Sequence, residues 1–302
     1  LEEKISQLMS DAPAIERLNI PKYNWWNESL HGVARAGYAT VFPQSISIAA
    51  SWDAQLVREV ATAISNEARA KHHEYLRRDQ HDIYQGLTMW SPNINIFRDP
   101  RWGRGHETYG EDPFLTGTLG AQYVKGLQGD DPEYLKVVAT AKHFAVHSGP
   151  EESRHYFNAN TSKSNLWETY LPAFRMLVKD AQVQSVMTAY NRFRGEAASS
   201  NKLLFDILRN KWGFDGYVVS DCGAINDIWE DHKITADAAS ASALALETGT
   251  DLNCGATYKS LEEAIANGLI TEEKINIAIE RLFRARLKLG MFDTEENLRY
   301  AT

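Results

Sequence analysis

The sequence has little cysteine, no long apolar run and no excess of positive charge. Two cysteines in 302 residues cannot form a disulfide framework or a four-cysteine zinc site. No run reaches the roughly 18 apolar residues that a bilayer crossing requires. The formal net charge of −8, without a separate basic cluster, gives phosphate backbones nothing to neutralise. We therefore expect a protein that neither spans a membrane nor binds nucleic acid.

The two cysteines are Cys222 and Cys254. Free cysteine commonly packs as a small buried apolar side chain. We interpret both as packed thiols, with a bridge between them as the alternative.

Short apolar segments alternate with longer helical patterns along the chain. The expected strands are 88–96, 137–144, 184–189, 216–220 and 244–252, with a further candidate near 39–48. The expected helices are 56–68, 113–127, 164–180, 202–211, 235–246, 258–266 and 271–289. This alternation is typical of β/α units around a parallel sheet. We predict one α/β domain over residues 1–302, a (β/α)8 TIM-type barrel in which an irregular first strand is allowed for.

Polar residues follow several of these strands. Lys142 and His143 end one strand, Tyr190 follows the next, and Asp221 follows the strand after that. Arg104 lies beyond the strand "LTMWSPNINIF". Because the carboxyl ends of parallel barrel strands lie on one face, we expect these side chains to meet in one pocket.

The apolar run in "GFDGYVVSDCGAI" stops on Asp221, and a buried carboxylate needs a partner or a function. From the residues alone, Asp221 could be a nucleophile, a metal ligand or a helix N-cap. Lys142 and His143 could bind sugar hydroxyls, hold a carboxylate ionised or form a structural ion pair.

Histidines and tryptophans allow further interpretations. His143, His147 and His155 suggest a metal site, but Pro150 follows in a loop-like segment without an HExxH pattern, so we do not favour a metal. We expect His72 and His73 to be solvated. Trp25, Trp26, Trp90 and Trp102 fit either core packing or an aromatic surface for pyranose rings, and no phosphate-binding glycine loop competes with the sugar interpretation.

Six segments in order resemble the catalytic barrel of family 3 glycoside hydrolases. They are "NWWNESLHGVAR", "FPQSISIAASWD", "RDPRWGRGHETYGEDP", "KHFAVHSGPEESRHYFNA", "SVMTAYNRFRGEAASSNKLLFDILRNKWGFDGYVVSDCGAI" and "RLFRARLKLGMFD". The resemblance covers nearly the whole chain. It implies a retaining double displacement without a cofactor or metal, on an oligosaccharide or aryl glycoside.

The resemblance also implies roles for individual residues. Asp221 matches the nucleophile, and a set of side chains matches the sugar-binding positions. That set is Arg104, Lys142, His143, Arg154 and Tyr190, to which our prediction adds Glu28, His155 and Met187.

The segment "NWWNESLHG" resembles the β-xylosidase branch, where Glu28 would fill the space that the hydroxymethyl group of a glucoside needs. We therefore expect removal of β-D-xylosyl residues from xylo-oligosaccharides, as in xylan degradation. β-Glucosidase and α-L-arabinofuranosidase activities stay open, because one carbon is worth only about 1–3 kcal/mol of discrimination. A noncatalytic sugar-binding barrel and a metal-dependent hydrolase are the alternatives from other classes.

Most of the family takes its general acid/base from a second, C-terminal α/β sandwich domain, which we do not find in this chain. A single-domain branch uses an Asp-His pair after the KHF strand, but here that loop reads "ESRH". We expect a two-domain enzyme, with His155 as a binding or structural residue. Since the chain begins at Leu1, we expect an initiator Met or leader to have been removed, and a secreted or periplasmic location.

Overall fold

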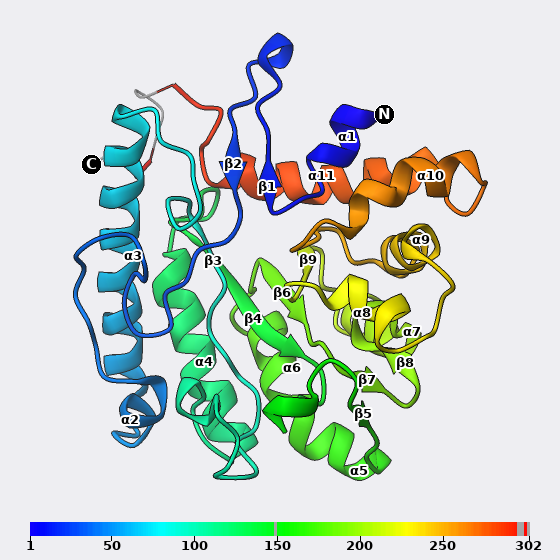
Figure 1. Cartoon of the computed structure of the whole chain (residues 1–302). Coiled ribbons are helices and arrows are strands. Elements are labelled where there is room, and N and C mark those ends of the chain that lie inside the picture. Colours follow the sequence, from blue (N-terminus) through cyan, green and yellow to red (C-terminus); the bar gives the residue numbers. More distant parts are fainter. Residues whose placement is uncertain (148–149, 295–298, 301–302) are drawn as a thin grey trace.

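The computed structural model describes residues 1–147, 150–294 and 299–300, and arranges helices around a central group of strands (Figure 1). The strands are β1 (Asp11–Ala12), β2 (Tyr23–Asn24), β3 (Thr88–Met89), β4 (Val138–Phe144), β5 (Asn158–Ala159), β6 (Ser185–Thr188), β7 (Arg192–Phe193), β8 (Glu196–Ala197) and β9 (Tyr217–Ser220). The helices are α1 (Glu2–Ser6), α2 (Ser45–Ala49), α3 (Ala54–Arg77), α4 (Pro113–Gln128), α5 (Lys163–Asn165), α6 (Pro172–Lys179), α7 (Lys202–Phe205), α8 (Ala224–Glu230), α9 (Ala238–Thr248), α10 (Leu261–Ala266) and α11 (Glu272–Lys288).

Strand pairing closes the centre of the molecule into a ring. The strands β3, β4, β6 and β9 are parallel neighbours in that order. Single bridges continue the ring from Val219 to Leu252, from Asn253 to Met9, and from Met89 to Asn27. The short strands β1 and β2 complete it as an antiparallel pair. In the described residues the ring therefore joins seven segments. The predicted α/β class is confirmed. The ring is consistent with the predicted (β/α)8 barrel, although it joins seven described segments rather than eight strands, and it begins with an irregular, antiparallel strand.

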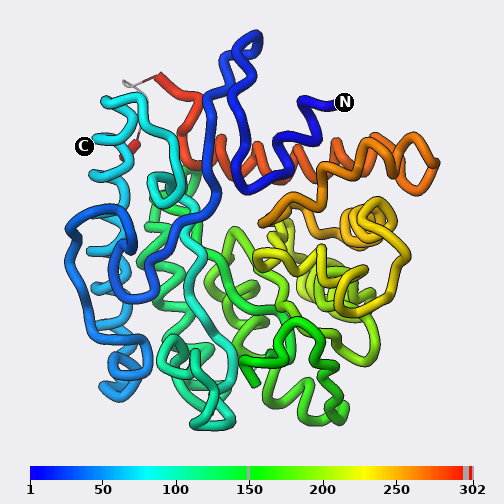
Figure 2. Tube along the Cα trace, in the orientation of Figure 1, coloured from blue at the N-terminus to red at the C-terminus, as the bar shows by residue number. Residues whose placement is uncertain are grey.

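Helices cover the outside of the ring, with α3, α4 and α6 side by side along one flank (Figures 1 and 2). The apolar face predicted for α3 is buried, from Val57 to Ala68. Gly126 allows α4 to approach α3 closely, because a Cβ there would lie 2.5 Å from the carbonyl oxygen of Arg58. No helix in the described parts of the chain has the length and hydropathy needed to span a membrane.

Two predicted strands are wrong. The segment 244–252 is helical through Thr248, because its Ala and Leu residues suit a buried helix as well as a strand, and only Leu252 joins the ring. The candidate at 39–48 is a loop followed by α2. The predicted helix 164–180 is divided into α5, a π-helix at Leu166–Tyr170, and α6, which begins at Pro172.

The prediction that His72 is solvated is also wrong. Its side chain is buried on α3, and its Nδ1 lies 2.7 Å from the carbonyl oxygen of Gln85. Burial lowers the pKa of His72 to about 4, so the ring is neutral and its Nδ1–H donates to that carbonyl. His73, its neighbour, is half-buried.

Candidate active site

The polar residues predicted to converge do so at the carboxyl ends of the strands. Asp221 directly follows β9, and Lys142 and His143 lie in β4. The His143 Nε2 lies 3.6 Å from Oδ2 of Asp221 and 3.2 Å from Nη2 of Arg104. Residues that are far apart in the sequence thus surround one carboxylate.

Asp221 is buried with one oxygen unpaired. Its Oδ1 accepts a 2.8 Å hydrogen bond from the backbone N–H of Cys222, whereas Oδ2 has no hydrogen-bond partner among the residues that the structure describes. Burial raises the pKa of Asp221, while Arg104, Lys142 and the Cys222 N–H act in the opposite direction. The N-cap alternative is wrong, because α8 begins after Gly223 and the Asp221 side chain does not cap it.

The protonation of His143 follows from its partners. Asn95 Oδ1, which can only accept, lies 2.8 Å from Nδ1, so Nδ1 carries the hydrogen. Burial, with Arg104, His147 and Lys142, lowers the pKa of His143 well below its usual value. The ring is therefore neutral, its Nε2 accepts from Arg104, and its approach to Asp221 is not an ion pair.

Glu107 fixes the position of Arg104, and the sequence reasoning did not identify it. Arg104 donates from Nε and Nη2 to the two oxygens of Glu107, both at 2.8 Å, and Asn93 donates to Glu107 at 3.2 Å. Burial opposes the charge on Arg104, but Glu107 outweighs it, and the pKa of Arg104 is raised. The sequence signal is limited to polar Asn93 and Asn95 inside an otherwise apolar strand pattern, which indicates a polar partner but does not identify Glu107.

Glu28 and Lys142 form one wall of a small pocket. Lys142 Nζ lies 3.1 Å from Oε2 of Glu28, and Trp26 Nε1 donates to Oε1 at 3.1 Å. The pocket has a volume of about 330 Å³ and is also lined by Arg104 and His31. This volume is at the small end of the range for ligand sites.

Arg154, His155 and Tyr190 come from two loops held together by the small sheet of β5, β7 and β8. The Arg154 guanidinium lies 5.4 Å from the centre of the Tyr190 ring and donates to Glu151 at 2.6 Å. Burial and the nearby Asp221 raise the pKa of Tyr190. His155 contacts the Tyr190 ring rather than facing the Glu28 pocket.

Met187, Trp25 and Trp90 are buried next to the pocket, and Trp26 lines it. Met187 is buried in β6 in register with Lys142, so the two side chains share a face of the sheet. Trp25 and Trp90 belong to the core, each 1% exposed. Trp26 stacks on Trp90 with ring centres 5.3 Å apart and is the tryptophan that lines the pocket.

The interpretation of the cysteines as thiols is wrong. A disulfide joins Cys222 to Cys254, whose Cα atoms lie 4.4 Å apart. The two segments are neighbours because Leu252 pairs with Val219 in the ring. Gly223 N–H donates to the Cys254 carbonyl at 2.8 Å, so the covalent link fixes the turn that follows Asp221.

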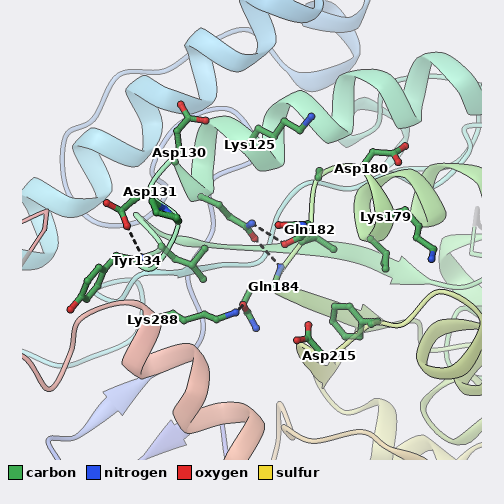
Figure 3. Close-up of a pocket in the computed structure, with 18 of the residues that line it drawn as sticks. Lys125, Asp130, Asp131, Tyr134, Lys179, Asp180, Gln182, Gln184, Asp215 and Lys288 are labelled. Carbon is green, nitrogen blue, oxygen red and sulfur yellow. Dashed lines mark hydrogen bonds between the residues drawn. The ribbon is translucent and has the colours of Figure 1, made fainter.

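A larger pocket, of about 810 Å³, lies at the opposite ends of the strands (Figure 3). Several of its polar groups bond to one another, since Lys288 donates to Gln184 at 3.0 Å and Gln128 hydrogen-bonds to residues 182 and 184. In α/β barrels the amino-terminal face serves stability, whereas reactions occur at the carboxyl ends. We therefore take the smaller pocket as the site.

The fold is an α/β barrel, and a buried carboxylate lies beside cationic side chains at the carboxyl ends of its strands. This is the arrangement found in the class of barrel enzymes. Within this class, the chain belongs to the family described as "Glycosyl hydrolase family 3 N terminal domain", whose sequence model matches residues 2–285.

Named relatives share this barrel. The chain is 48% identical over 300 residues to a xylan 1,4-beta-xylosidase of Xylanibacter ruminicola, covering 97% of this chain and 35% of the relative. It is 43% identical over 320 residues to a probable exo-1,4-beta-xylosidase of Aspergillus clavatus, covering 99% and 40%. The chain thus spans less than half the length of these relatives.

Solved structures agree. The exo-beta-xylosidase XlnD in complex with a xylobiose aziridine probe superimposes with a TM-score of 0.92 at 35% identity, over 99% of this chain and 40% of that one. A beta-glucosidase of Listeria innocua in complex with glucose gives a TM-score of 0.82 at 29% identity, over 100% and 46%.

Proposed function

We propose that the protein containing this chain is a retaining, exo-acting glycoside hydrolase that removes β-D-xylosyl residues from the nonreducing ends of xylo-oligosaccharides. The single observation that carries the proposal is Oδ2 of Asp221, a buried carboxylate oxygen beside His143 that has no hydrogen-bond partner in the described parts of the chain, with Arg104 and Lys142 to favour its ionised form. A carboxylate without a partner in a cationic pocket is suited to attack rather than to structure.

The reaction proceeds in two displacements. In the first, Oδ2 of Asp221 forms a bond to the anomeric carbon, the bond to the leaving oxygen breaks, and that oxygen takes a proton from a general acid. In the second, water attacks the anomeric carbon, loses its proton to the same group, and releases Asp221.

We assign the general acid/base to a C-terminal domain of the whole protein. The greater length of the relatives supports this assignment, since the chain covers 35% and 40% of two of them. The barrel, residues 1–302, would then supply the nucleophile and sugar binding.

The sugar-binding role falls to the side chains around Asp221. Lys142, Arg104 and the Arg154 guanidinium donate to ring hydroxyls, and neutral His143 accepts through Nε2 when Arg104 turns to the sugar. Tyr190 would border the nucleophile, and buried Met187 would support Lys142 from beneath.

Glu28 would select a pentose. Its two oxygens accept hydrogen bonds from Lys142 and Trp26, which hold the carboxylate in place. We expect a glucoside to need this space for its hydroxymethyl group. The xylosidase names of relatives that are 43% and 48% identical support this preference over the beta-glucosidase at 29%.

The test is covalent labelling with 2-deoxy-2-fluoro-xylosyl fluoride, followed by peptide mass spectrometry. We expect one label on Asp221, none in Asp221→Asn, and normal labelling in Asp215→Asn, a matched control at the opposite end of β9 (Figure 3). Label on another carboxylate would refute the assignment.

A second experiment examines the general acid. Without it, the 302-residue chain should be nearly inert on xylobiose but should slowly release dinitrophenolate from an activated xyloside, because this leaving group needs no proton. Azide should accelerate turnover by attacking the intermediate. Efficient xylobiose hydrolysis would place an acid/base within the chain.

A further inference from the structure

His155 and Asp227 form a hydrogen-bonded pair beside the proposed site. Nδ1 of His155 lies 2.8 Å from Oδ2 of Asp227. The Asp227 side chain is 6% exposed, whereas that of His155 is 36% exposed. A buried carboxylate paired with one histidine holds that ring in a fixed orientation.

The histidine ring packs against Tyr190. The two ring centres lie 4.6 Å apart, within the range of stacked and edge-on aromatic pairs. Arg154 packs against the same tyrosine. Tyr190 in turn follows β6 two residues after Thr188, whose carbonyl accepts a 3.2 Å hydrogen bond from the Asp221 N–H, and Tyr190 and Asp221 each shift the pKa of the other.

Asp227, at one end of these contacts, belongs to the same chain segment as Asp221. Asp227 lies on α8, which starts three residues after Asp221. Ala224 N–H donates to the Asp221 carbonyl at 3.0 Å, and Asp227 N–H donates to Gly223 at 3.0 Å, so this turn is rigid. The contacts from Asp227 through His155 to Tyr190 thus connect the helix that follows Asp221 with the loop that follows β6, the strand beside Asp221.

We propose that His155 and Asp227 are positioning residues, which hold Tyr190 against Asp221 in the orientation that the attack on the anomeric carbon requires. The inference rests on the proposed function. It gives His155 an indirect role, in place of the direct sugar contact that the sequence predicted, and it adds Asp227, which the sequence did not single out.

The geometry separates two contributions that substitutions can test. The His155 ring supplies the packing surface for Tyr190, and the Nδ1–H bond to Asp227 sets the ring angle. His155→Phe keeps the ring and loses the bond, whereas His155→Ala loses both. Asp227→Asn keeps an accepting oxygen for Nδ1–H, whereas Asp227→Leu has none.

The experiment follows labelling of Asp221 by 2-deoxy-2-fluoro-xylosyl fluoride over a range of reagent concentrations, which gives a binding constant and a maximal rate. We expect His155→Ala and Asp227→Leu to lower the maximal rate about 10- to 100-fold, the scale of lost support or misplacement. The binding constant should stay within about twofold. His155→Phe and Asp227→Asn should recover much of the rate.

Two controls distinguish this role from a merely structural one. Glu230→Gln changes a carboxylate on the same helix that bonds only to Asn226 among the contacts seen, and it should leave both constants unchanged. In a Tyr190→Ala background, His155→Ala should cause no further loss, because the ring it positions is gone. Circular dichroism checks that each variant folds.

Three outcomes would overturn the inference. A raised binding constant with an unchanged maximal rate would make His155 a sugar ligand. A full effect of His155→Ala without the Tyr190 ring would show that the pair acts elsewhere. Unchanged constants in all variants would remove any role. If the unaltered protein is not labelled at Asp221, the proposed function itself fails, and this inference fails with it.

Discussion

Breaking the Cys222–Cys254 disulfide should destabilise the barrel and disturb the proposed nucleophile together. The bridge joins two cysteines that are 32 residues apart in the sequence. The segment between them contains Asp227, α9 and Leu252, which pairs with Val219 in the ring. It also holds the turn whose Cys222 N–H donates to Oδ1 of Asp221. Stability and reactivity are therefore linked at one covalent bond.

The magnitude follows from the loop that the bridge closes. In the chain-entropy treatment, a cross-link over 32 residues stabilises the folded state by about 4 kcal/mol. For a chain of 302 residues the entropy of unfolding is about 0.6 kcal/mol/K. Loss of the bridge should therefore lower Tm by about 6 °C.

The assay compares the unaltered protein, the same protein after reduction, and a Cys222→Ala/Cys254→Ala double variant. Calorimetry gives Tm, and 2-fluoro-xylosyl labelling gives the reactivity of Asp221. We expect reduction and the double substitution to lower both, and reducing agent to have no effect on the double variant. Two titratable thiols in the unfolded, unreduced protein would refute the reasoning outright, as would an unchanged Tm after complete reduction.

Three further predictions concern single carboxylates. Asp221→Asn should raise Tm at pH 7. Burial raises the pKa of Asp221 in the native state, so between the ordinary pKa and the raised pKa the native state binds more protons than the unfolded state. The stability of the unaltered protein therefore falls as the pH rises through this range. Calorimetry at pH 3 should show that this gain has disappeared. Glu28→Asp should raise kcat/KM for aryl glucosides relative to aryl xylosides about tenfold in the whole enzyme, and an unchanged ratio would exclude Glu28 from specificity. Asp251→Asn should cost about 3–5 kcal/mol in denaturant unfolding, because it leaves Arg209 and Arg281, each 2.8 Å from its oxygens, without their buried partner; a loss below 1 kcal/mol would contradict this.

Local patterns predicted most of the fold. Apolar spacing identified α4 to within one residue and the start of α3 to within two, although α3 continues nine residues beyond the predicted end, and strands β4, β6 and β9 lie inside the segments predicted for them. The errors fall where a pattern fits two structures, as in 244–252, whose alanines and leucines are equally compatible with a helix. The packing of α9 against α8, α10 and α11, which no local signal records, decided that segment.

The prediction of the site succeeded for residues at strand ends and failed for their supports. Asp221, Lys142 and His143 were identifiable because buried strands end on them. Glu107 was not identifiable, because it positions Arg104 through two hydrogen bonds that depend on how one loop folds. His72 was mistaken for a solvated residue because a charged neighbourhood in sequence does not reveal a carbonyl partner on another segment.

The sequence by itself determined the order of strands and helices and the polar residues at the carboxyl ends, because both depend on spacing along the chain. Only the tertiary structure decided the pairing of Cys222 with Cys254, the tautomer of His143, and the contact from Asp227 through His155 to Tyr190. Each of these depends on a distance of a few ångströms between segments separated by tens of residues. Such distances are set by closure of the ring and by helix packing, which periodicity in the sequence does not encode.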